Sequence, residues 1–255
     1  MLHQITITCQ VKEEKPIPHY GWGMRLHGFL MQHLPPAVAQ ELHIMQTRPF
    51  SQYLQPLPER MLCWHISLWD DGIAAHFAAA LLPLQHIMLD LTKYHQVSLT
   101  VLQTTHQHTA FDFLQTDSPG PSDCHLEFST PTAHAGNGQQ IIFPSPALIY
   151  HSIIHRIAPY IPDDADFQDR SLVAALSQQT TIQQYALHSA SFPIKGLHVS
   201  GYIGDLVLRF HGSTIRRIQS EKVLRLAAYT GIGIKTAMGM GGCRVTLRVK
   251  PSSTE

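Results

Sequence analysis

The segment from residue 231 to residue 242, GIGIKTAMGMGG, places five glycines and one lysine within twelve residues. Glycine adopts positive φ angles without strain and lets a ligand approach the main chain, and consecutive free N–H groups in such a segment form a concave anion site. The segment therefore predicts a binding site for an anion, with phosphate as the first candidate. The predicted contact residues are Gly231, Gly233, Lys235, Thr236, Gly239 and Gly241.

Known nucleotide-binding motifs do not describe this glycine segment. Lys235 follows Ile234, so the Gly-Lys-Ser/Thr of a P-loop is absent, and the segment follows an expected helix, where a dinucleotide-binding fingerprint requires a strand. Nucleotide hydrolysis is therefore disfavoured. The alternative to phosphate binding is a purely structural role, because glycines are common in bulges and tight turns where strands begin.

The two halves of the chain differ in charge. Residues 195–250 hold ten Lys/Arg against two acids, whereas residues 1–127 hold six Lys/Arg against eleven Asp/Glu. A basic segment of this kind favours binding to a polyanion, and nucleic acid is the commonest one. Arg216 and Arg217, expected in an exposed turn, and Arg244, at the start of the final strand, are further candidates for phosphate contact.

Length and composition indicate an ordinary globular protein. The chain has 255 residues, of which 44% are hydrophobic, enough for two domains with buried cores. The four cysteines are far apart and form no CxxC pair, so neither a zinc ribbon nor a disulfide framework is expected. The N-terminus lacks a signal-peptide pattern and no apolar run approaches about 18 residues, so we expect a cytoplasmic protein with no membrane partner.

The N-terminal half alternates strand-like and helix-like patterns. Residues 2–12 alternate apolar and polar side chains, as a half-buried strand does, and apolar residues then recur at helical spacing up to Pro35. The order strand, helix, strand, helix, strand is typical of the ferredoxin-like βαββαβ arrangement, in which helices cover one face of an antiparallel sheet and the other face stays open. The further expected elements are helices over 22–33, from Pro36 and over 71–82, and strands over 61–69, 86–91 and 97–105.

Residues 118–123, SPGPSD, are dense in turn-forming residues and predict a linker. We therefore expect an N-terminal domain over residues 1–117 and a C-terminal domain over residues 124–255. The final strand, residues 243–250, alternates apolar with mostly basic side chains, so one of its faces is predicted to be basic. The other expected elements of the second domain are strands over 125–129, 196–203 and 206–210 and helices over 147–157, 171–181 and 220–229.

Three stretches resemble the CRISPR-associated endoribonucleases of the RAMP superfamily, which cut precursor CRISPR RNA within its repeats. Residues 226–241 are similar to the family's C-terminal glycine-rich loop with its entering helix. Residues 126–132, 143–146 and 150–156 are similar to the opening of its second domain, and residues 28–51 to its first helix and catalytic segment. The resemblance implies an α+β fold of two tandem ferredoxin-like domains with antiparallel sheets, and RNA bound across both.

The resemblance also implies a catalytic histidine. In relatives it often lies in a Leu-His pair a few residues before a basic-Pro-Phe turn, and His43, five residues before Arg48, matches that position. Other members use a histidine on the first helix, which here is His27 or His33. His33 falls in step with the apolar stripe of that helix, so core packing is its expected role. Some members bind RNA without a catalytic histidine.

The cleavage that the resemblance implies is independent of metal and leaves a 2′,3′-cyclic phosphate and a 5′-hydroxyl. It requires a proton to leave the 2′-hydroxyl and another to reach the 5′-oxygen, and histidine suits both transfers. A nearby cation stabilises the added negative charge of the transition state. Our leading hypothesis makes His43 the principal proton-transfer group and Arg48 the cation, with His27 as the rival or as the source of the second proton transfer.

Two other functions fit the same sequence. A non-catalytic subunit of a CRISPR effector complex would hold the processed guide RNA on the same basic surface. A zinc-dependent hydrolase would use His151 and His155, spaced i, i+4 on an expected helix, but no third ligand is identifiable. We therefore expect no metal and no cofactor. The expected partners are CRISPR repeat RNA and other effector subunits, and the sequence leaves open the homodimerisation that occurs among relatives.

Overall fold

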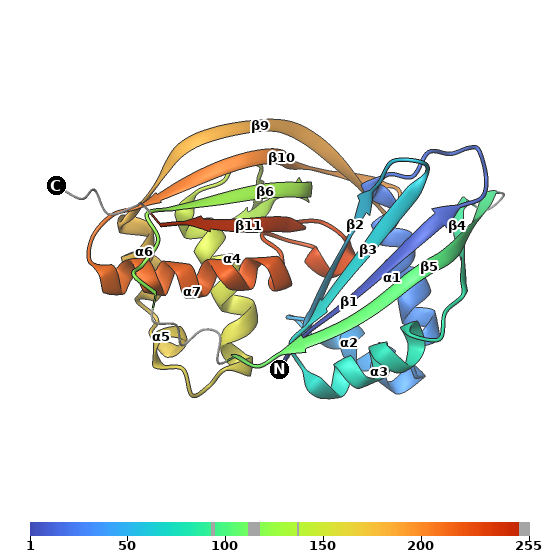
Figure 1. The fold of residues 1–255 in the computed structure, drawn as a ribbon, viewed down its shortest axis with the longest axis horizontal. Helices are drawn as coiled ribbons and strands as arrows, with labels where there is room; N and C mark the ends of the chain where they lie inside the picture. Colours follow the sequence, from blue (N-terminus) through green and yellow to red (C-terminus); the bar gives the residue numbers. More distant parts are fainter. Residues whose placement is uncertain (93–94, 112–117, 137, 250–255) are drawn as a thin grey trace.

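The computed structural model describes residues 1–92, 95–111, 118–136 and 138–249, which form two units of sheet and helices side by side (Figure 1). The end of the expected N-terminal domain, at residue 117, and the end of the expected final strand, at Lys250, lie outside the described residues. Among the described residues no helix is both long and apolar enough to cross a membrane.

The first unit is a five-stranded antiparallel sheet with helices on one face. Its elements are β1 (Leu2–Val11), η1 (Tyr20–Trp22), α1 (Gly23–His33), α2 (Pro36–Ile44), β2 (Phe50–Pro56), β3 (Met61–Leu68), α3 (Asp71–Leu81), β4 (His86–Thr92) and β5 (His95–Thr109). The strand order is β2-β3-β1-β5-β4. Strands β1, β2, β3 and β5 follow the ferredoxin-like order that the sequence predicts, and β4 extends the edge of the sheet.

Local sequence explains how these elements form. Ile5 and Ile7 of β1 are fully buried against the helices, whereas the residues between them are only partly buried on the opposite face. Helix α3 begins where the Asp70 side chain accepts a hydrogen bond from the Ile73 N–H. Helix α2 begins at Pro36, at a position where an N–H group would have no partner within the helix.

The second unit is a four-stranded antiparallel sheet whose order repeats that of the first. Its elements are β6 (Asp123–Thr132), β7 (His134–Gly136), β8 (Gln139–Ile141), α4 (Pro146–Ile157), η3 (Ala158–Tyr160), α5 (Ala165–Gln168), α6 (Leu172–Gln178), β9 (Thr180–Ile194), β10 (Leu197–Phe210), α7 (Thr214–Thr230), η4 (Thr236–Met238) and β11 (Cys243–Arg248). The order β11-β6-β10-β9 is the ferredoxin-like order. Leu126 and Phe128 of β6 pack against Ile153 of α4 and Leu224 of α7, so these helices cover one face of the sheet.

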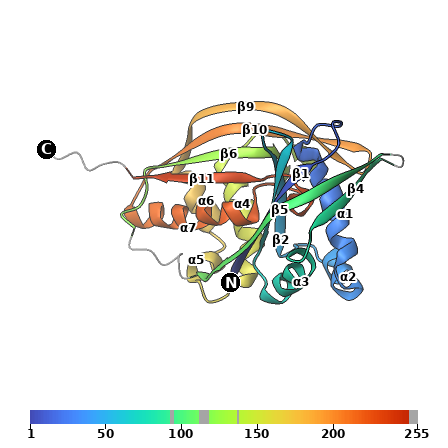
Figure 2. The same ribbon diagram turned by 45° about the vertical axis from the view of Figure 1, so that its right-hand side comes forward.

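The long hairpin of β9 and β10 reaches from the second unit to the first (Figure 1, Figure 2). Near its tip the Tyr20 hydroxyl donates to the Ser191 carbonyl at 3.2 Å, and the Tyr20 ring stacks on Phe192 at 6.1 Å. Deeper in the contact, the Gln52 Nε2 group donates to the carbonyls of Gly23 at 2.8 Å and Ala237 at 3.3 Å. The two units therefore share buried polar and aromatic contacts.

Among the described residues, the sequence patterns did not predict the long strands β2 and β9, or the short pair β7 and β8. β2 is buried on both faces over most of its length, because the second unit covers the face that an isolated sheet would expose, so polar and apolar residues do not alternate along it. β9 is an edge strand that is largely exposed on both faces. Its sequence therefore lacks the alternation of apolar and polar residues that marks a strand with one buried face. The two strands expected over 196–203 and 206–210 are one continuous strand, β10, with an irregular register between Tyr202 and Gly204.

Two helix boundaries also differ from the prediction. α6 ends at Gln178, because the chain enters β9 at Thr180, where the sequence predicted a helix to residue 181. α7 begins at Thr214, six residues before the expected start, because the Ser213 hydroxyl accepts a hydrogen bond from the Arg216 N–H and caps the helix. Arg216 and Arg217 therefore lie in the first helical turn and not in an exposed turn.

Candidate RNA-binding site

A pocket of about 410 Å³ lies where the two units meet, and we call it the interdomain pocket. Its walls come from the connection between α2 and β2, from the end of α4 and from the glycine segment. Three of its lining side chains, Arg48, Arg156 and Lys235, are cationic, and none of its lining residues is acidic. The full lining is Gln46, Thr47, Arg48, Phe50, Ala135, His155, Arg156, Ile234, Lys235, Thr236, Ala237 and Met238.

The glycine segment is packed inside the protein more tightly than the sequence suggested. The N–H groups of all five glycines donate to partners within the chain: Gly231 to Ala227, Gly233 to the Ser152 hydroxyl, Gly239 to Thr236, Gly241 to Pro131 and Gly242 to the Thr130 hydroxyl. The expectation that these groups are free to bind an anion is therefore wrong. Whether the segment contacts RNA through its other atoms stays a prediction.

The positive φ angles of the glycines serve close backbone packing. Gly233 has φ 84°, and a Cβ at this position would collide with the Ala133 carbonyl oxygen, to which the Ile234 N–H donates at 2.7 Å. Lys235 is exposed, whereas the other residues from 231 to 242, Thr236 among them, are buried or half-buried. The segment therefore presents one charged side chain to the pocket and uses its glycines to hold that side chain in place.

Arg156, at the end of α4, holds the glycine segment through hydrogen bonds to its carbonyls. Its guanidinium donates to the Ser152 carbonyl at 2.9 Å, to the Gly231 carbonyl at 3.5 Å and to the Gly233 carbonyl. Burial lowers the pKa of Arg156 to about 10, so it remains a cation at neutral pH. Arg156 is not recognisable from the sequence, because no local pattern connects a basic residue in the last turn of one helix with carbonyls some 75 positions later.

Arg48 links the end of α2 to the pocket. Its Nε group donates to the Leu42 carbonyl at 2.7 Å, and its Nη2 group lies 3.5 Å from the His43 carbonyl. Arg48 therefore binds carbonyls that the end of a helix leaves without intrahelical partners. The predicted pair of His43 and Arg48 is in contact, but through the backbone of His43. The His43 side chain is exposed on α2 and is not among the residues that line the pocket.

His27, on α1, lies behind the pocket wall. Its ring stacks on Phe50 at 6.1 Å, and its Nδ1 atom is buried without a hydrogen-bond partner in the described part of the chain. Burial and, to a smaller extent, the positive charge of Arg48 lower the pKa of His27 to about 4, although a hydrogen bond with the Ala237 backbone opposes the shift. His27 is therefore neutral at pH 7. The structure brings it, more than the His43 ring, toward the residues that line the pocket.

His33 differs from its expected role. It is exposed near the end of α1, where its Nδ1 atom lies 2.8 Å from the Phe29 carbonyl and its ring stacks on Phe29 at 3.9 Å. The apolar stripe of α1 is carried by Leu26 and Leu30, which are fully buried, so His33 lies outside the core.

One arginine of the expected basic face of the final strand, Arg244, is paired with an acid of the neighbouring strand β6. We call the side of β6, β10 and β11 that faces away from the helices the open face of the second sheet. On this face the Arg244 guanidinium lies 3.5 Å from Glu127, and the Arg209 guanidinium lies 2.6 Å from Asp123. Opposed strands therefore supply one acid for each of these arginines, which the sequence of β11 alone does not reveal.

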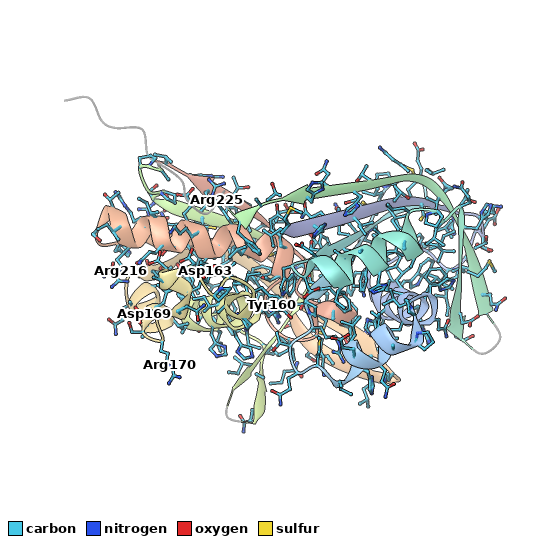
Figure 3. All side chains as sticks on the ribbon, turned by 90° about the horizontal axis from the view of Figure 1, so that it is seen from below. Tyr160, Asp163, Asp169, Arg170, Arg216 and Arg225 are labelled. Carbon is cyan, nitrogen blue, oxygen red and sulfur yellow. The ribbon has the colours of Figure 1, made fainter. Side chains whose placement is uncertain are left out.

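Arg216 and Arg217 are not part of the interdomain pocket. They lie in the first turn of α7, whereas the glycine segment follows its last turn, so about 20 Å of helix separates them. Arg216 donates to the Gln219 Oε1 atom at 2.8 Å, and Figure 3 shows it at the N-terminal end of α7, near Asp169 and Arg170. The structure thus divides the predicted phosphate contacts among three separate places.

The His151 and His155 rings lie 5.7 Å apart and stack on α4. His155 also lines the interdomain pocket, where its Nε2 atom is 3.4 Å from the Thr47 hydroxyl. Across the described ranges, no group of three or more His, Cys, Asp or Glu side chains is assembled around a common point for a metal ion.

Comparison with known proteins gives a consistent result along the chain. A family model described as CRISPR-associated endoribonuclease Cas6 matches residues 126–243. A Cas6 endoribonuclease of Streptococcus thermophilus is 24% identical over 231 residues, which is 91% of this chain and 94% of that protein. One from Mycobacterium tuberculosis is 25% identical over 249 residues, which is 96% of this chain and 78% of that protein.

Solved structures agree with the topology described above. A Cas6 protein in a product complex superposes with a TM-score of 0.78 at 22% identity, over 96% of this chain and all of that one. These similarities confirm the resemblance that the three sequence stretches indicated, and the tandem ferredoxin-like fold is the one that the sequence predicted.

Proposed function

We propose that this chain is a Cas6-type CRISPR-associated endoribonuclease, which binds CRISPR repeat RNA and cuts the precursor within its repeats. The observation that carries this proposal is the interdomain pocket, where Arg48, Arg156 and Lys235 gather without a carboxylate among the lining residues. A pocket of this charge suits a phosphodiester, because the cations interact directly with its oxygens. Relatives similar along nearly the whole chain carry the name of this endoribonuclease, which supports the assignment.

The proposed reaction is attack of the 2′-hydroxyl oxygen on the adjacent phosphorus, with loss of the 5′-oxygen of the next nucleotide. The products are a 2′,3′-cyclic phosphate and a 5′-hydroxyl, and no metal takes part. Arg48 and Lys235 stabilise the negative charge that develops on the phosphoryl oxygens. The glycine segment contributes by holding Lys235, and Arg156 by holding the glycine segment.

Two histidines divide the proton transfers in this proposal. His27 is neutral at pH 7 because burial and the Arg48 charge lower its pKa to about 4. It can therefore accept a proton, but as a weak base, because its pKa lies well below the working pH. His43, exposed at the end of α2, is the principal proton-transfer group and delivers the proton to the leaving 5′-oxygen. The RNA then crosses the end of α2 to reach the pocket.

The test is cleavage of a labelled repeat RNA from the host's own array in excess EDTA. We expect the wild type to cut once, and to fail on a substrate with a single 2′-deoxy at the cut site. We expect His43→Ala to slow cleavage by about 10²–10⁴-fold, the usual contribution of a general acid or base. His33→Ala, an exposed histidine on α1, is the matched control and should cut at the wild-type rate. A requirement for divalent metal, or cutting that survives the combined loss of His43 and His27, would contradict the mechanism.

One observation favours a second candidate function. Because the His43 ring is not among the pocket-lining residues, the pocket also suits a subunit that holds processed RNA without cutting it. Tight binding of repeat RNA by the wild type with no cut product would support this role. In that case Lys235→Ala should still weaken RNA binding, since its cation contacts phosphate in both functions.

A further inference from the structure

Gln52, on β2, has a side-chain amide buried where α1, β2 and η4 meet, a contact that we call the interdomain seam. The residue is 1% exposed, and its Nε2 group donates to the Gly23 carbonyl at 2.8 Å and to the Ala237 carbonyl at 3.3 Å. Its Oε1 atom accepts a hydrogen bond of 2.6 Å from the Trp64 indole of β3. One amide therefore joins two strands of the first sheet to the start of α1 and to the glycine segment of the second unit.

We propose that Gln52 is the positioning residue that sets His27 of the first unit against Lys235 of the second, so that both groups reach the same phosphodiester. This role rests on the proposed function, because it belongs to that reaction. The amide is buried in protein and does not itself reach RNA. A misplacement of about 1 Å can cost about 10²-fold in rate. The attraction between Lys235 and a phosphate varies slowly with distance, so we expect the rate of cleavage to depend on Gln52 far more than the affinity for RNA does.

The hydrogen-bonding groups around the Gln52 amide fix its orientation. An amide oxygen only accepts and an amide nitrogen only donates, whereas the neighbours are two carbonyl oxygens on one side and an indole N–H on the other. Half a turn of the amide would place its oxygen against both carbonyls and its N–H groups against the indole N–H. The three hydrogen bonds are therefore made together or lost together, and the amide supports one arrangement of the interdomain seam.

On the side of the first unit, the Gly23 carbonyl lies at the base of the helical turn that carries His27. In an α-helix the carbonyl of residue 23 accepts from the N–H of residue 27, so Gln52 holds α1 one turn before this histidine. β2 also contacts the ring, because Phe50, two residues before Gln52 and on the same face of the strand, stacks on His27 at 6.1 Å. The strand therefore holds both the backbone and the ring of His27.

On the side of the second unit, the Ala237 carbonyl lies two residues after Lys235. The two residues belong to one short turn, which is closed where the Met238 N–H donates to the Lys235 carbonyl at 2.9 Å. The turn lies close to α1, because a Cβ on Gly239 would be only 3.2 Å from the Cα atom of Gly23. Backbone therefore packs on backbone here, and a shift of Ala237 away from Gln52 would carry Lys235 with it.

Ser51 makes a comparable contact between the two units without this role. It precedes Gln52 on β2, is buried, and lies on the opposite face of the strand, where its hydroxyl donates to the Tyr229 carbonyl of α7. Ser51→Ala therefore also removes a hydrogen bond between the units, but on the face of β2 away from Phe50 and Gln52. If Gln52 only stabilised the fold, substitutions at the two positions would have the same kind of effect.

The experiment is single-turnover cleavage of repeat RNA by the full chain at saturating enzyme, below the melting temperature of every variant. Gln52→Met keeps the length of the side chain and removes its hydrogen bonds. We expect it to slow cleavage by about 10- to 100-fold and to leave the affinity for RNA unchanged. Ser51→Ala is the matched control, and it should melt at a lower temperature than the wild type but cut at the wild-type rate.

Gln52→Glu adds a second variant that keeps both the length and the shape of the side chain. Its protonated carboxyl can donate to one of the two carbonyls and still accept from Trp64, whereas its ionised form repels both carbonyls. Its cleavage rate relative to the wild type should therefore rise as the pH falls from about 8 to about 6, since burial raises the pKa of a carboxyl. This rescue keeps the role testable if Gln52→Met does not fold.

The pKa of His27, measured by NMR on its ring and assigned with His27→Gln, is a readout that needs no cleavage. Burial, with a smaller contribution from the charge of Arg48, lowers this pKa to about 4 in the wild type. In Gln52→Met it should rise toward about 6.5 as water enters the interdomain seam, and in Ser51→Ala it should stay unchanged.

The two readouts separate the positioning role from the proposed function. A wild type that does not cut RNA would contradict the proposed function, while the pKa of His27 in Gln52→Met still decides whether the amide holds the interdomain seam. The positioning role is overturned if Gln52→Met leaves both the cleavage rate and the pKa of His27 at their wild-type values. It is also overturned if Ser51→Ala changes them as much as Gln52→Met does.

Discussion

The interdomain pocket and the open face of the second sheet both contain cationic side chains contributed by the C-terminal half of the chain, but they differ in what surrounds those cations. On the open face, Arg209 lies 2.6 Å from Asp123 and Arg244 lies 3.5 Å from Glu127. In the pocket, no ion pair of the described residues involves Arg48 or Lys235, and no lining residue is acidic.

This difference shows why the charge of a segment does not locate a binding site for RNA. A paired arginine has most of its field cancelled at short range, so a phosphate gains little by approaching it. The electric field of a cation without a carboxylate partner is not cancelled in this way, so the cation attracts an anionic ligand. The ten basic residues between 195 and 250 are therefore not equivalent, and the contacts of each one decide whether it contributes.

The largest expected effect is a loss of folding stability at acid pH. It should involve histidines beside both the interdomain pocket and the open face. Burial lowers the pKa of His27, beside Arg48, and of His65, beside Arg244, to about 4 each, and burial likewise lowers that of His134 to about 4. Because the unfolded chain binds these protons near pH 6.5 and the folded chain only near pH 4, the free energy of unfolding should fall as pH drops through this window, by up to roughly 3 kcal/mol per group.

Denaturant unfolding at a series of pH values measures this loss. His134→Gln removes one of the three groups, and its stability should fall less steeply between pH 6.5 and 4 than that of the wild type. A wild-type stability that is flat across the window would show that these histidines are not held neutral, and the roles proposed for His27 would fail with it.

The next effect separates packing from ligand binding in the glycine segment. Gly233→Ala should lower the free energy of unfolding by about 2–4 kcal/mol, because the new Cβ collides with the Ala133 carbonyl oxygen and the φ angle of 84° is strained for alanine. Gly28→Ala is the control: it lies within α1 with no atom within 4 Å of a new Cβ, and should stabilise by about 0.5–1 kcal/mol. Equal stability of the two variants in thermal and denaturant unfolding would mean that the glycines do not serve close packing.

The smallest effect is on the salt dependence of RNA binding. Lys235→Ala should reduce the slope of log affinity against log salt by about 0.7–1, the loss of one phosphate contact. Arg244→Ala should leave the slope unchanged, because its cation is already paired with Glu127. Filter binding of a non-cleavable repeat RNA at several salt concentrations measures both.

Glu127→Gln tests the same comparison in the opposite direction, because it should create an RNA-binding cation where the wild type has a paired one. It removes the carboxylate beside Arg244 and converts the open face into one that resembles the pocket, so RNA binding should strengthen and its salt slope should rise. If Glu127→Gln has no effect and Arg244→Ala weakens binding as much as Lys235→Ala, pairing does not decide which cations bind RNA.

Periodicity predicted the elements that have one buried and one open face. β1 and β11 alternate as the sequence indicated, and the resemblance supplied the tandem arrangement of the two units. β2 was not predicted because tertiary contacts cover both of its faces. β9 was not predicted because neither of its faces is covered over most of its length. Burial pattern is a property of the assembled fold, so these strands carry no local signal.

Prediction of the candidate site was limited in the same way. Sequence selected Arg48, Lys235 and His27, which the structure gathers around one pocket. It did not select Arg156, whose partners are backbone carbonyls distant in the chain. It also did not detect that Glu127 and Asp123 pair with Arg244 and Arg209 on the open face. Residue type and spacing predict which groups are available for chemistry, whereas strand register and side-chain pairing decide which of them stay free.

In the proposed reaction, the cations of the interdomain pocket stabilise the scissile phosphate. The most direct measurement is single-turnover cleavage of repeat RNA in EDTA by Arg48→Gln, which removes the charge and keeps an N–H donor for the carbonyls at the end of α2, beside Arg244→Ala. We expect Arg48→Gln to slow cleavage by about 10²-fold or more, and Arg244→Ala to cut at the wild-type rate. Cleavage that is slowed by Arg244→Ala and unaffected by Arg48→Gln would contradict the account.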